Sequence, residues 1–344
     1  MTQTLHDPRT INAHDFPFAG STKDQLYFLL NYAVLAPSCH NTQPWLFRLN
    51  DNSLDIYVDF KRALSIVDPD NREMVISCGA AIGTLVLAAK FFAYQAHVKY
   101  APTADPSGLL ANISLTKSHK PVTDDIAIFG AIMRRQTNRS PFDNMAIAPG
   151  VLNDCAQAAK SYGIEFVHVI DDKKKAFIAE LAELADRKQF SQPWFRNELA
   201  LWLRPKHQRN KDGMSAYRFG IPDFLTPIAG FIIRTFNIGK RVASSNRAKI
   251  QSASPALGVF ASQSDSQHDW LNAGHALAHV LLILTSRGLT AAYINQVIET
   301  PAFRRRLQKH LTSLAYPQLL LRLGRTAPSL PQSVRRSVYD CLME

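Results

Sequence analysis

Two segments of the chain share one unusual pattern, and this repeat limits the possible folds more than any other feature. Residues 78–89 (CGAAIGTLVLAA) and 273–284 (AGHALAHVLLIL) both begin with small residues and are apolar nearly all round. That pattern is typical of a helix packed on every side. Each segment precedes a predicted strand, at 96–100 and at 290–294. We therefore expect two related halves, although buried helices in general share much of this composition.

The length and composition permit two domains. The chain has 344 residues, of which 46% are hydrophobic, so it can bury a substantial core. A Pro-, Ser- and Thr-containing stretch at 103–123 predicts a division into residues 1–120 and 121–344. The second half would carry an inserted, lid-like segment at about 205–245. Mixed helices and strands around buried central helices indicate an α+β sandwich.

Local patterns predict the individual elements. Helices are expected at 22–36, 72–94, 124–134, 149–161, 172–187, 269–288 and 300–310. Strands are expected at 46–49, 53–60, 96–100, 163–170, 257–262, 290–294 and 316–323.

The net charge of +11 fits nucleic acid, anionic lipid or an anionic cofactor, and does not choose among them. Residues 1–18 lack an apolar run, so no secretory signal is expected. The four cysteines form no CxxC pair, which favours free thiols over a disulfide framework or a structural zinc site. We expect a cytoplasmic protein.

Two apolar segments could be mistaken for membrane elements. The segment at 75–89 is closed by Lys90 and is shorter than the roughly 20 residues that cross a bilayer, so it indicates a buried helix. The segment at 224–233 is shorter still and is followed by basic residues. It fits a covering or interface helix, or an amphipathic stretch on a membrane surface. Stable membrane association is not expected.

The loop at 36–45 (APSCHNTQPW) bears most directly on function. It presents a hydroxyl, a thiol, an imidazole and two carboxamides between an apolar helical run and a strand. Such groups suit a planar heterocycle that is hydrogen-bonded around its edge. A flavin fits this description better than a metal or a phosphate.

A second motif is basic. Residues 134–142 (RRQTNRSPF) place three guanidinium groups close to short polar side chains at the end of a predicted helix. Arginine binds phosphate oxygens in a bidentate manner, and a nearby hydroxyl can complete the site. Alternatively, these residues form a solvated basic helix end. Two further arginines, Arg335 and Arg336, would add charge to the same phosphate or lie on the surface.

Other site types have little support. His268, His275 and His279 share one helical face, but the segment lacks the glutamate of a zinc protease, so no metal site is expected. Neither a GxGxxG nor a Walker phosphate loop is present, which argues against a Rossmann nicotinamide domain.

At its two polar motifs the chain resembles the FMN-dependent nitroreductase family. Residues 37–45 resemble the flavin loop of that family, and residues 135–139 resemble its phosphate-binding motif. In the family the phosphate motif comes first and each flavin lies between two subunits, whereas here the order is reversed. Two fused halves explain the reversal, as in the Acg-like branch of internal pseudo-dimers. The resemblance spans 24–342 and implies a nitroreductase-like α/β sandwich with one complete FMN site.

The resemblance assigns roles to residues of the second half. Arg135 would hold the FMN phosphate, Thr137 would assist, and Arg139 would approach the pyrimidine edge of the ring. Asn246 and Lys249 resemble an Asn-x-x-Lys element. Lys249 would then face N1 and O2 of the flavin, where a fixed cation raises the reduction potential; a surface lysine is the alternative.

The remaining assignments concern the loop and a tetrapeptide. From the first half, Pro37, Ser38, Cys39 and Asn41 would contact the ring or the ribityl chain. Residues 293–296 (YINQ) stand where the family has a tetrapeptide whose backbone amide meets flavin N5, which involves Ile294, Asn295 and Gln296. Asn295 and Gln296 replace the usual acidic and glycine residues, so the main-chain donor would survive but substrate access would differ.

The resemblance implies an oxidoreductase that transfers hydride from NAD(P)H through flavin N5 to a nitroaromatic or quinone, with no catalytic side chain required. A non-catalytic FMN-binding protein, with a lid over its single site, is the alternative. Binding of nucleic acid through the basic surface ranks last and predicts a steep salt dependence. We expect small-molecule partners, no nucleic acid, and a monomeric pseudo-dimer or weak homodimer.

Overall fold

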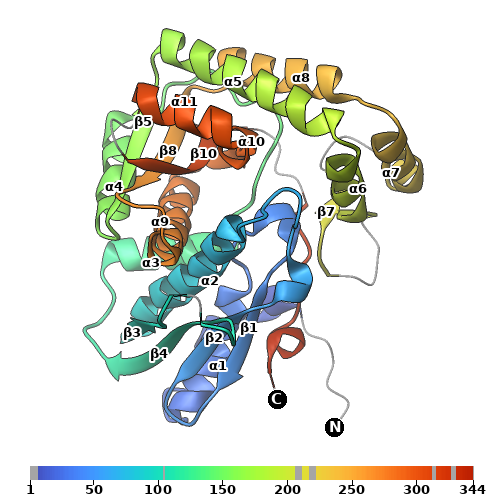
Figure 1. The fold of residues 1–344 in the computed structure, drawn as a ribbon. Coiled ribbons are helices and arrows are strands. Elements are labelled where there is room, and N and C mark those ends of the chain that lie inside the picture. The colour runs from blue at the N-terminus through green and yellow to red at the C-terminus, as the bar shows by residue number, and fades with distance from the viewer. Residues whose placement is uncertain are drawn as a thin grey trace.

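The computed structural model describes residues 7–103, 105–205, 211–216, 222–311, 315–326 and 331–343. Within them the chain forms two four-stranded antiparallel sheets on either side of a central pair of long helices (Figure 1). This arrangement confirms the predicted α+β class.

The two sheets have the same topology. The first contains β1 (Trp45–Leu49), β2 (Leu54–Val58), β3 (Tyr94–Tyr100) and β4 (Leu109–Lys117), in the order β1-β2-β4-β3. The second contains β5 (Ile164–Val169), β8 (Ala256–Ser262), β9 (Thr290–Tyr293) and β10 (Tyr316–Gly324), in the order β5-β8-β10-β9. In each half a 20-residue helix joins the second strand to the third: α2 (Arg72–Phe91) and α9 (Gln267–Ser286). The equivalent order and connections support the internal repeat.

Glycines allow the two central helices to touch. A Cβ atom on Gly79 would lie 2.3 Å from the Leu271 carbonyl oxygen, and one on Gly274 would lie 2.2 Å from the Ile76 carbonyl oxygen. Each glycine therefore meets the backbone three residues before the other glycine. This reciprocal contact is what an approximate twofold relationship between α2 and α9 requires.

The other helices form outer layers. Those that pack into the main core are α1 (Thr22–Ala33), α3 (Thr123–Ile132) and α4 (Pro149–Lys160). A second core lies under α5 (Asp172–Ser191), α8 (Gly239–Ser252), α10 (Gln296–Glu299) and α11 (Pro301–Leu311). These helices cover the outer face of the second sheet (Figure 1), which explains why β8 is buried along its whole length.

To one side of the molecule lie α6 (Pro193–Leu201) and α7 (Thr226–Thr235), with a short parallel pair formed by β6 (Leu203–Arg204) and β7 (Met214–Ser215) (Figure 1). They belong to the predicted lid-like segment and its approach. Residues 206–210 and 217–221 of that segment lie outside the described residues.

The stretch predicted as a linker contains a strand. Residues 109–117 form β4, which pairs with both β2 and β3 in the first sheet. Pro106, Ser107 and Gly108 form a turn, and the apolar residues after them alternate with polar ones, which is a strand pattern that the linker interpretation missed. The division at residue 120 stays a prediction. The prediction places the carboxyl terminus in the second half. In the structure, however, Leu342 pairs with Phe47 of β1, which belongs to the first sheet.

Among the described helices, only α2 is long and apolar enough to span a membrane, and 83% of its most apolar window is buried inside the protein. Its apolar character is accounted for by its place in the core.

Candidate functional site

The loop that follows α1 has an unusual backbone. His40, Asn41 and Gln43 have positive φ angles of 47°, 56° and 52°. Such angles are uncommon for residues other than glycine and persist only where surrounding contacts impose them. Here the Ser38 hydroxyl accepts a hydrogen bond from the Gln43 amide at 2.9 Å. The loop is thus held in one strained shape with its side chains turned to defined partners.

Gln43 anchors this loop from within. Its side chain is completely buried. Its Nε2 donates to the Lys211 carbonyl at 2.7 Å, and its Oε1 accepts from the Arg336 amide at 2.8 Å. Gln43 therefore ties the loop to the lid-like segment and to the carboxyl-terminal segment.

The basic motif lies directly beside the loop. After α3, Thr137 pairs with Ala291 of β9, and the Asn138 amide donates to the Ala291 carbonyl at 3.1 Å. The segment is thereby fixed along the second sheet. Arg135 is buried and donates from Nη2 to the Leu35 carbonyl at 3.3 Å, just before the loop. The two predicted motifs, one from each half, come together.

Arg335 shares an acceptor with Arg135. Its Nη2 donates to the carbonyls of Leu35 and Ala36, both at 3.3 Å, and its Nη1 donates to Asn41 Oδ1 at 2.9 Å. Arg336 does not, which corrects that assignment. Its guanidinium donates to the Gln43 and Asp340 carbonyls and lies 3.9 Å from Asp59. Arg336 thus supports the loop through its hydrogen bond to the Gln43 carbonyl.

A second cationic group lies further along the same segment. Arg322 of β10 donates from Nη2 to the carbonyls of Arg139 and Ser140, at 3.3 and 3.2 Å. Burial and the nearby Arg139 lower the pKa of Arg322 to about 10. Burial, Arg322 and Arg139 also lower the pKa of Lys249. Lys249, Arg139 and Arg322 therefore interact electrostatically, and an anion bound near these three cations would be stabilised.

Buried polar atoms without a hydrogen-bond partner gather around these motifs. Several of the residues concerned lie in or beside the loop, the basic motif or β9, whereas Ser215 lies in β7 and Thr226 in α7. Within the described part of the chain, such atoms include His40 Nδ1, Arg135 Nη1, Gln136 Oε1, Asn138 Nδ2 and Tyr293 Oη. A buried donor or acceptor left unsatisfied costs about 1–3 kcal/mol, so this number of them in one place indicates a site for a polar ligand.

Three of these residues have shifted pKa values, and burial lowers that of Arg135. Burial and the charge of Arg139 lower the pKa of His40 to about 4, so its imidazole is neutral at physiological pH. Burial raises the pKa of Tyr293 to about 12, so its hydroxyl keeps its proton. Tyr293 can thus donate a hydrogen bond to a ligand, and His40 offers one donor and one acceptor.

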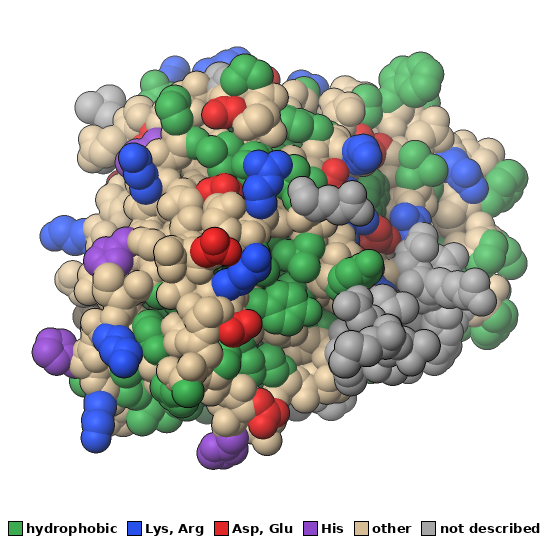
Figure 2. Space-filling view, turned by 90° about the horizontal axis from the view of Figure 1, so that it is seen from below, with side chains coloured by type: hydrophobic (Ala, Val, Ile, Leu, Met, Phe, Trp, Pro, Cys, Tyr) green, Lys and Arg blue, Asp and Glu red, His purple; other side chains and the backbone are tan. Residues whose placement is uncertain are grey.

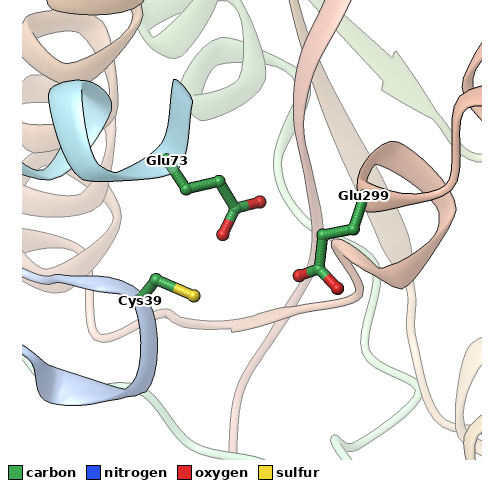
Figure 3. A group of neighbouring side chains, drawn as sticks. All are labelled: Cys39, Glu73 and Glu299. Carbon is green, nitrogen blue, oxygen red and sulfur yellow. The ribbon is translucent and has the colours of Figure 1, made fainter. Parts of the chain in front are cut away.

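An acid and thiol cluster borders the loop. The ligand atoms of Cys39, Glu73 and Glu299 lie within 4.8 Å of one another, and Figure 3 shows the three side chains pointing toward a common centre. Burial raises the pKa of Glu73, and burial together with Glu73 raises the pKa of Glu299 well above its usual range. Burial and the two carboxyls also keep Cys39 protonated by raising its pKa. The cluster can therefore hold a proton between its carboxyls.

The tetrapeptide at 293–296 makes hydrogen bonds within the protein. The Ile294 amide donates to the Leu320 carbonyl at 2.9 Å, so it completes the second sheet and is not available to a ligand. Asn295 donates from Nδ2 to Glu73 at 3.0 Å and accepts from the Leu320 amide at 3.0 Å. These contacts correct the expectation for Ile294 and link Asn295 to the acid cluster.

Asn246 and Gln296 have a different partner from the one expected. Their side-chain amides donate to Asp186 Oδ2 of α5, at 2.9 and 3.3 Å. Burial raises the pKa of Asp186 to about 6. The structure therefore uses Asn246 to join α8 to α5, whereas Lys249, one turn further along α8, reaches the cationic group.

The segment predicted to be lid-like contacts the loop. The Gly213 amide donates to the Asn41 carbonyl at 3.2 Å, and Asn41 Nδ2 donates back to the Gly213 carbonyl at 3.1 Å. Asp212 lies 2.8 Å from Arg62 and 3.4 Å from Arg204. Met214 Sδ is 4.0 Å from Arg139 Nη2. The segment thus contacts both motifs.

Among the described residues, the two halves differ in the connection that forms the loop. In the first half, residues 34–44 connect α1 to β1 and form the loop. In the second half, the equivalent connection between α4 and β5 is only residues 161–163, too short to form a comparable loop. A separate cavity of about 660 Å³ lies near the ends of α4 and α8, lined by residues that include Leu152, His168 and Gln251, and contains none of the predicted site residues.

Several residues of the site were missed from the sequence. Arg322 interrupts an apolar strand. Because arginine is rarely buried unless it has a partner, its position in such a strand is a sequence signal for a functional charge. Glu73 opens the most apolar helix, which is a comparable signal. Gln43 lay within the loop motif but was not singled out, and Glu299 carried no local signal because its neighbours come from other parts of the chain.

The chain matches relatives over nearly its whole length, but no protein-family model matches it. It is 29% identical over 338 residues to a protein of Mycobacterium tuberculosis (strain H37Rv) provisionally named NAD(P)H nitroreductase, covering 96% of this chain and 93% of the relative. It is 24% identical over 332 residues to the provisionally named NAD(P)H nitroreductase acg of the same strain, covering 93% and 95%.

Two solved structures that contain FMN resemble part of the chain. A nitroreductase with bound FMN from Bacteroides fragilis covers 60% of this chain and 91% of its own, with 17% identity and a TM-score of 0.34. Iodotyrosine deiodinase bound to FMN and 3-iodo-L-tyrosine covers 60% and 94%, with 16% identity and a TM-score of 0.39.

Proposed function

We propose that this nitroreductase-family protein of the Acg-like branch binds one FMN between its two halves and acts as an oxidoreductase. The observation that carries the proposal is the concentration of unsatisfied buried polar atoms on Arg135, Asn138, His40 and Tyr293, where the loop meets the basic motif. A ligand with a phosphate at one end and a polar heterocycle at the other would satisfy these groups.

The residues present fit FMN. Arg135 and Arg335 share one carbonyl acceptor and would hold the phosphate, with Thr137 beside them. Arg139 and Lys249 would meet the anionic edge of the reduced ring, assisted by Arg322. Pro37, Ser38, Cys39 and Asn41 would border the ring and ribityl chain.

When bound, the flavin supplies the redox chemistry by taking hydride from a donor, proposed to be NAD(P)H, and passing it to an electron-poor acceptor such as a nitroaromatic or quinone. The protein supplies position and charge. Fixed cations at Lys249 and Arg139 favour the anionic state of the ligand. Burial raises the pKa of the Tyr293 hydroxyl to about 12, so this group keeps its proton at neutral pH. Burial also raises the pKa of the Glu73 and Glu299 carboxyls.

A second candidate is a protein that sequesters FMN without turnover. The contacts favouring it are those of the lid-like segment, where Gly213 pairs with Asn41 and Asp212 lies between Arg62 and Arg204. If these contacts persist in solution, a nicotinamide could not reach the ring and the flavin would remain oxidised.

One experiment tests both candidates. The purified protein should be yellow and should release about one FMN per chain on heating. Mixing it with NADPH without oxygen separates the two functions: rapid loss of flavin absorbance indicates the oxidoreductase, and an unchanged spectrum indicates sequestration. A colourless protein that does not bind added FMN would contradict both.

A further inference from the structure

Helix α7 carries large apolar side chains on its outer, exposed side. Thr226, Ala229 and Gly230 face the protein and are buried. On the opposite side, Ile228 is 52% exposed and Phe231 is 57% exposed. The pattern continues at both ends of the helix, where Phe224 and Phe236 are 79% and 56% exposed. The outer face is therefore apolar along its length.

Helical geometry places these side chains together. Residues 228, 231, 232 and 235 fall on one face of a helix with 3.6 residues per turn. Three of them are Ile228, Phe231 and Ile232, and the fourth is Thr235, so this outer face holds only one polar side chain. Figure 2 shows hydrophobic side chains with Lys and Arg among them along the edge where α6 and α7 lie. We call Phe224, Ile228, Phe231, Ile232 and Phe236 the α7 face.

Basic residues predominate in the sequence of the α7 face and in the segment that follows it, after Asp223. The sequence contains no Asp or Glu from residue 224 to residue 264. The same stretch contains five basic residues, and three of them follow the face closely: Arg234, Lys240 and Arg241, all exposed. Exposed aromatic and aliphatic side chains flanked by basic residues are typical of a helix that lies in the interface of an anionic membrane.

A second copy of the chain fits this face less well. A twofold dimer would bring the same basic residues of both copies together, and the chain already carries a net charge of +11. The ten residues of α7 also offer much less than the roughly 800 Å² per partner that a stable interface buries.

We propose that the α7 face binds reversibly to the surface of a membrane rich in anionic phospholipid. The apolar side chains would enter the headgroup region, and Arg234, Lys240 and Arg241 would contact lipid phosphates. This inference does not depend on the proposed flavin chemistry. It places the lid-like segment, which contacts the candidate site through Gly213 and Met214, at the lipid surface.

Sedimentation of the purified full-length protein with vesicles tests the proposal. The protein should pellet with mixed phosphatidylcholine and phosphatidylglycerol vesicles, fail to pellet with phosphatidylcholine alone, and lose binding as salt rises. The double substitution I228S/F231S should weaken binding by about tenfold or more. A matched control, V122S/I126S, removes exposed apolar side chains from another helix and should bind as the wild type does.

A charge substitution completes the test. K240E/R241E should also lose binding, whereas K173E/K174E, on the exposed start of α5, should lose much less. Absence of binding to the anionic vesicles would overturn the proposal, as would unchanged binding by I228S/F231S. A dimer in solution that dissociates in I228S/F231S, without vesicle binding by the wild type, would assign the face to a second copy instead.

Discussion

Arg135 and Arg335 donate hydrogen bonds to the same acceptor, the carbonyl oxygen of Leu35, each at 3.3 Å. Both side chains are buried, with exposed fractions of 9% and 5%. Two guanidinium groups held this close repel each other, and burial strengthens the repulsion because there is less water to screen it. An anion bound between them would remove that cost. We therefore propose that the phosphate end of the cofactor lies between these two side chains.

Replacing Arg135 by alanine should weaken FMN binding by about tenfold to a hundredfold, since a hydrogen bond to a charged group contributes about 1.5–3 kcal/mol. The measurement is the FMN dissociation constant, from quenching of flavin fluorescence on titration into apoprotein. Arg134 provides the matched control because it is the adjacent arginine and is exposed. Equal weakening by R134A and R135A would show that general charge, and not this site, holds the ligand.

Removal of the Asp212 carboxylate should loosen the lid-like segment, because Asp212 joins Arg62 and Arg204. The D212A variant should be bleached by NADPH at least about tenfold faster than the wild type, which corresponds to a loss of about 1.4 kcal/mol of closure. Stopped-flow absorbance without oxygen measures the rate. D51A removes a fully exposed carboxylate near Lys23 and should have no effect. Identical rates in all three proteins would mean that the segment does not limit access.

The Glu73 and Glu299 carboxyls should make the protein less stable as pH rises. Burial raises the pKa of both, so the folded chain keeps protons that the unfolded chain has released above its carboxyl pKa of about 4.3. The free energy of unfolding therefore falls as pH increases through this range. In E299Q one of the two titrations is removed, and its amide oxygen can still accept from Gln189.

Thermal unfolding should consequently depend less on pH in E299Q. At pH 8 its Tm should exceed that of the wild type by a few degrees, and at pH 5 the difference should shrink. E165Q, which changes an exposed glutamate on β5, should retain the wild-type pH dependence. A Tm difference for E299Q that is the same at both pH values would rule out a raised pKa at Glu299.

Contact between the central helices should be sensitive to a single methyl group. In G79A the new Cβ would meet the Leu271 carbonyl oxygen at 2.3 Å, so the helices must move apart at a cost of about 2 kcal/mol or more. G130A, in α3, meets nothing within 4 Å and should stabilise the protein by about 0.5–1 kcal/mol through helix propensity. Denaturant unfolding measures both, and a neutral G79A would contradict the close packing.

Much of the fold follows from local pattern. The repeat at 78–89 and 273–284 predicted the two central helices, because an all-round apolar surface has to be buried whatever surrounds it. The strands of the second sheet were also predicted from local pattern, and the structure contains all four: β5, β8, β9 and β10. The β4 strand was missed, since its alternating pattern follows a turn that resembles a linker.

The residues of the candidate site also fall into two groups: those recognisable from the sequence and those that only the tertiary structure brings together. The loop and the basic motif were recognisable because their residue types follow one another in the chain. Tertiary structure alone decided that Arg335 joins Arg135, that Arg336 and Ile294 serve other contacts, and that Glu299 faces Glu73. Burial, and the electrostatic interaction of groups far apart in the sequence, depend on which segments of the backbone lie side by side in the folded chain. Short-range patterns determined which elements form, and long-range packing determined which side chains meet.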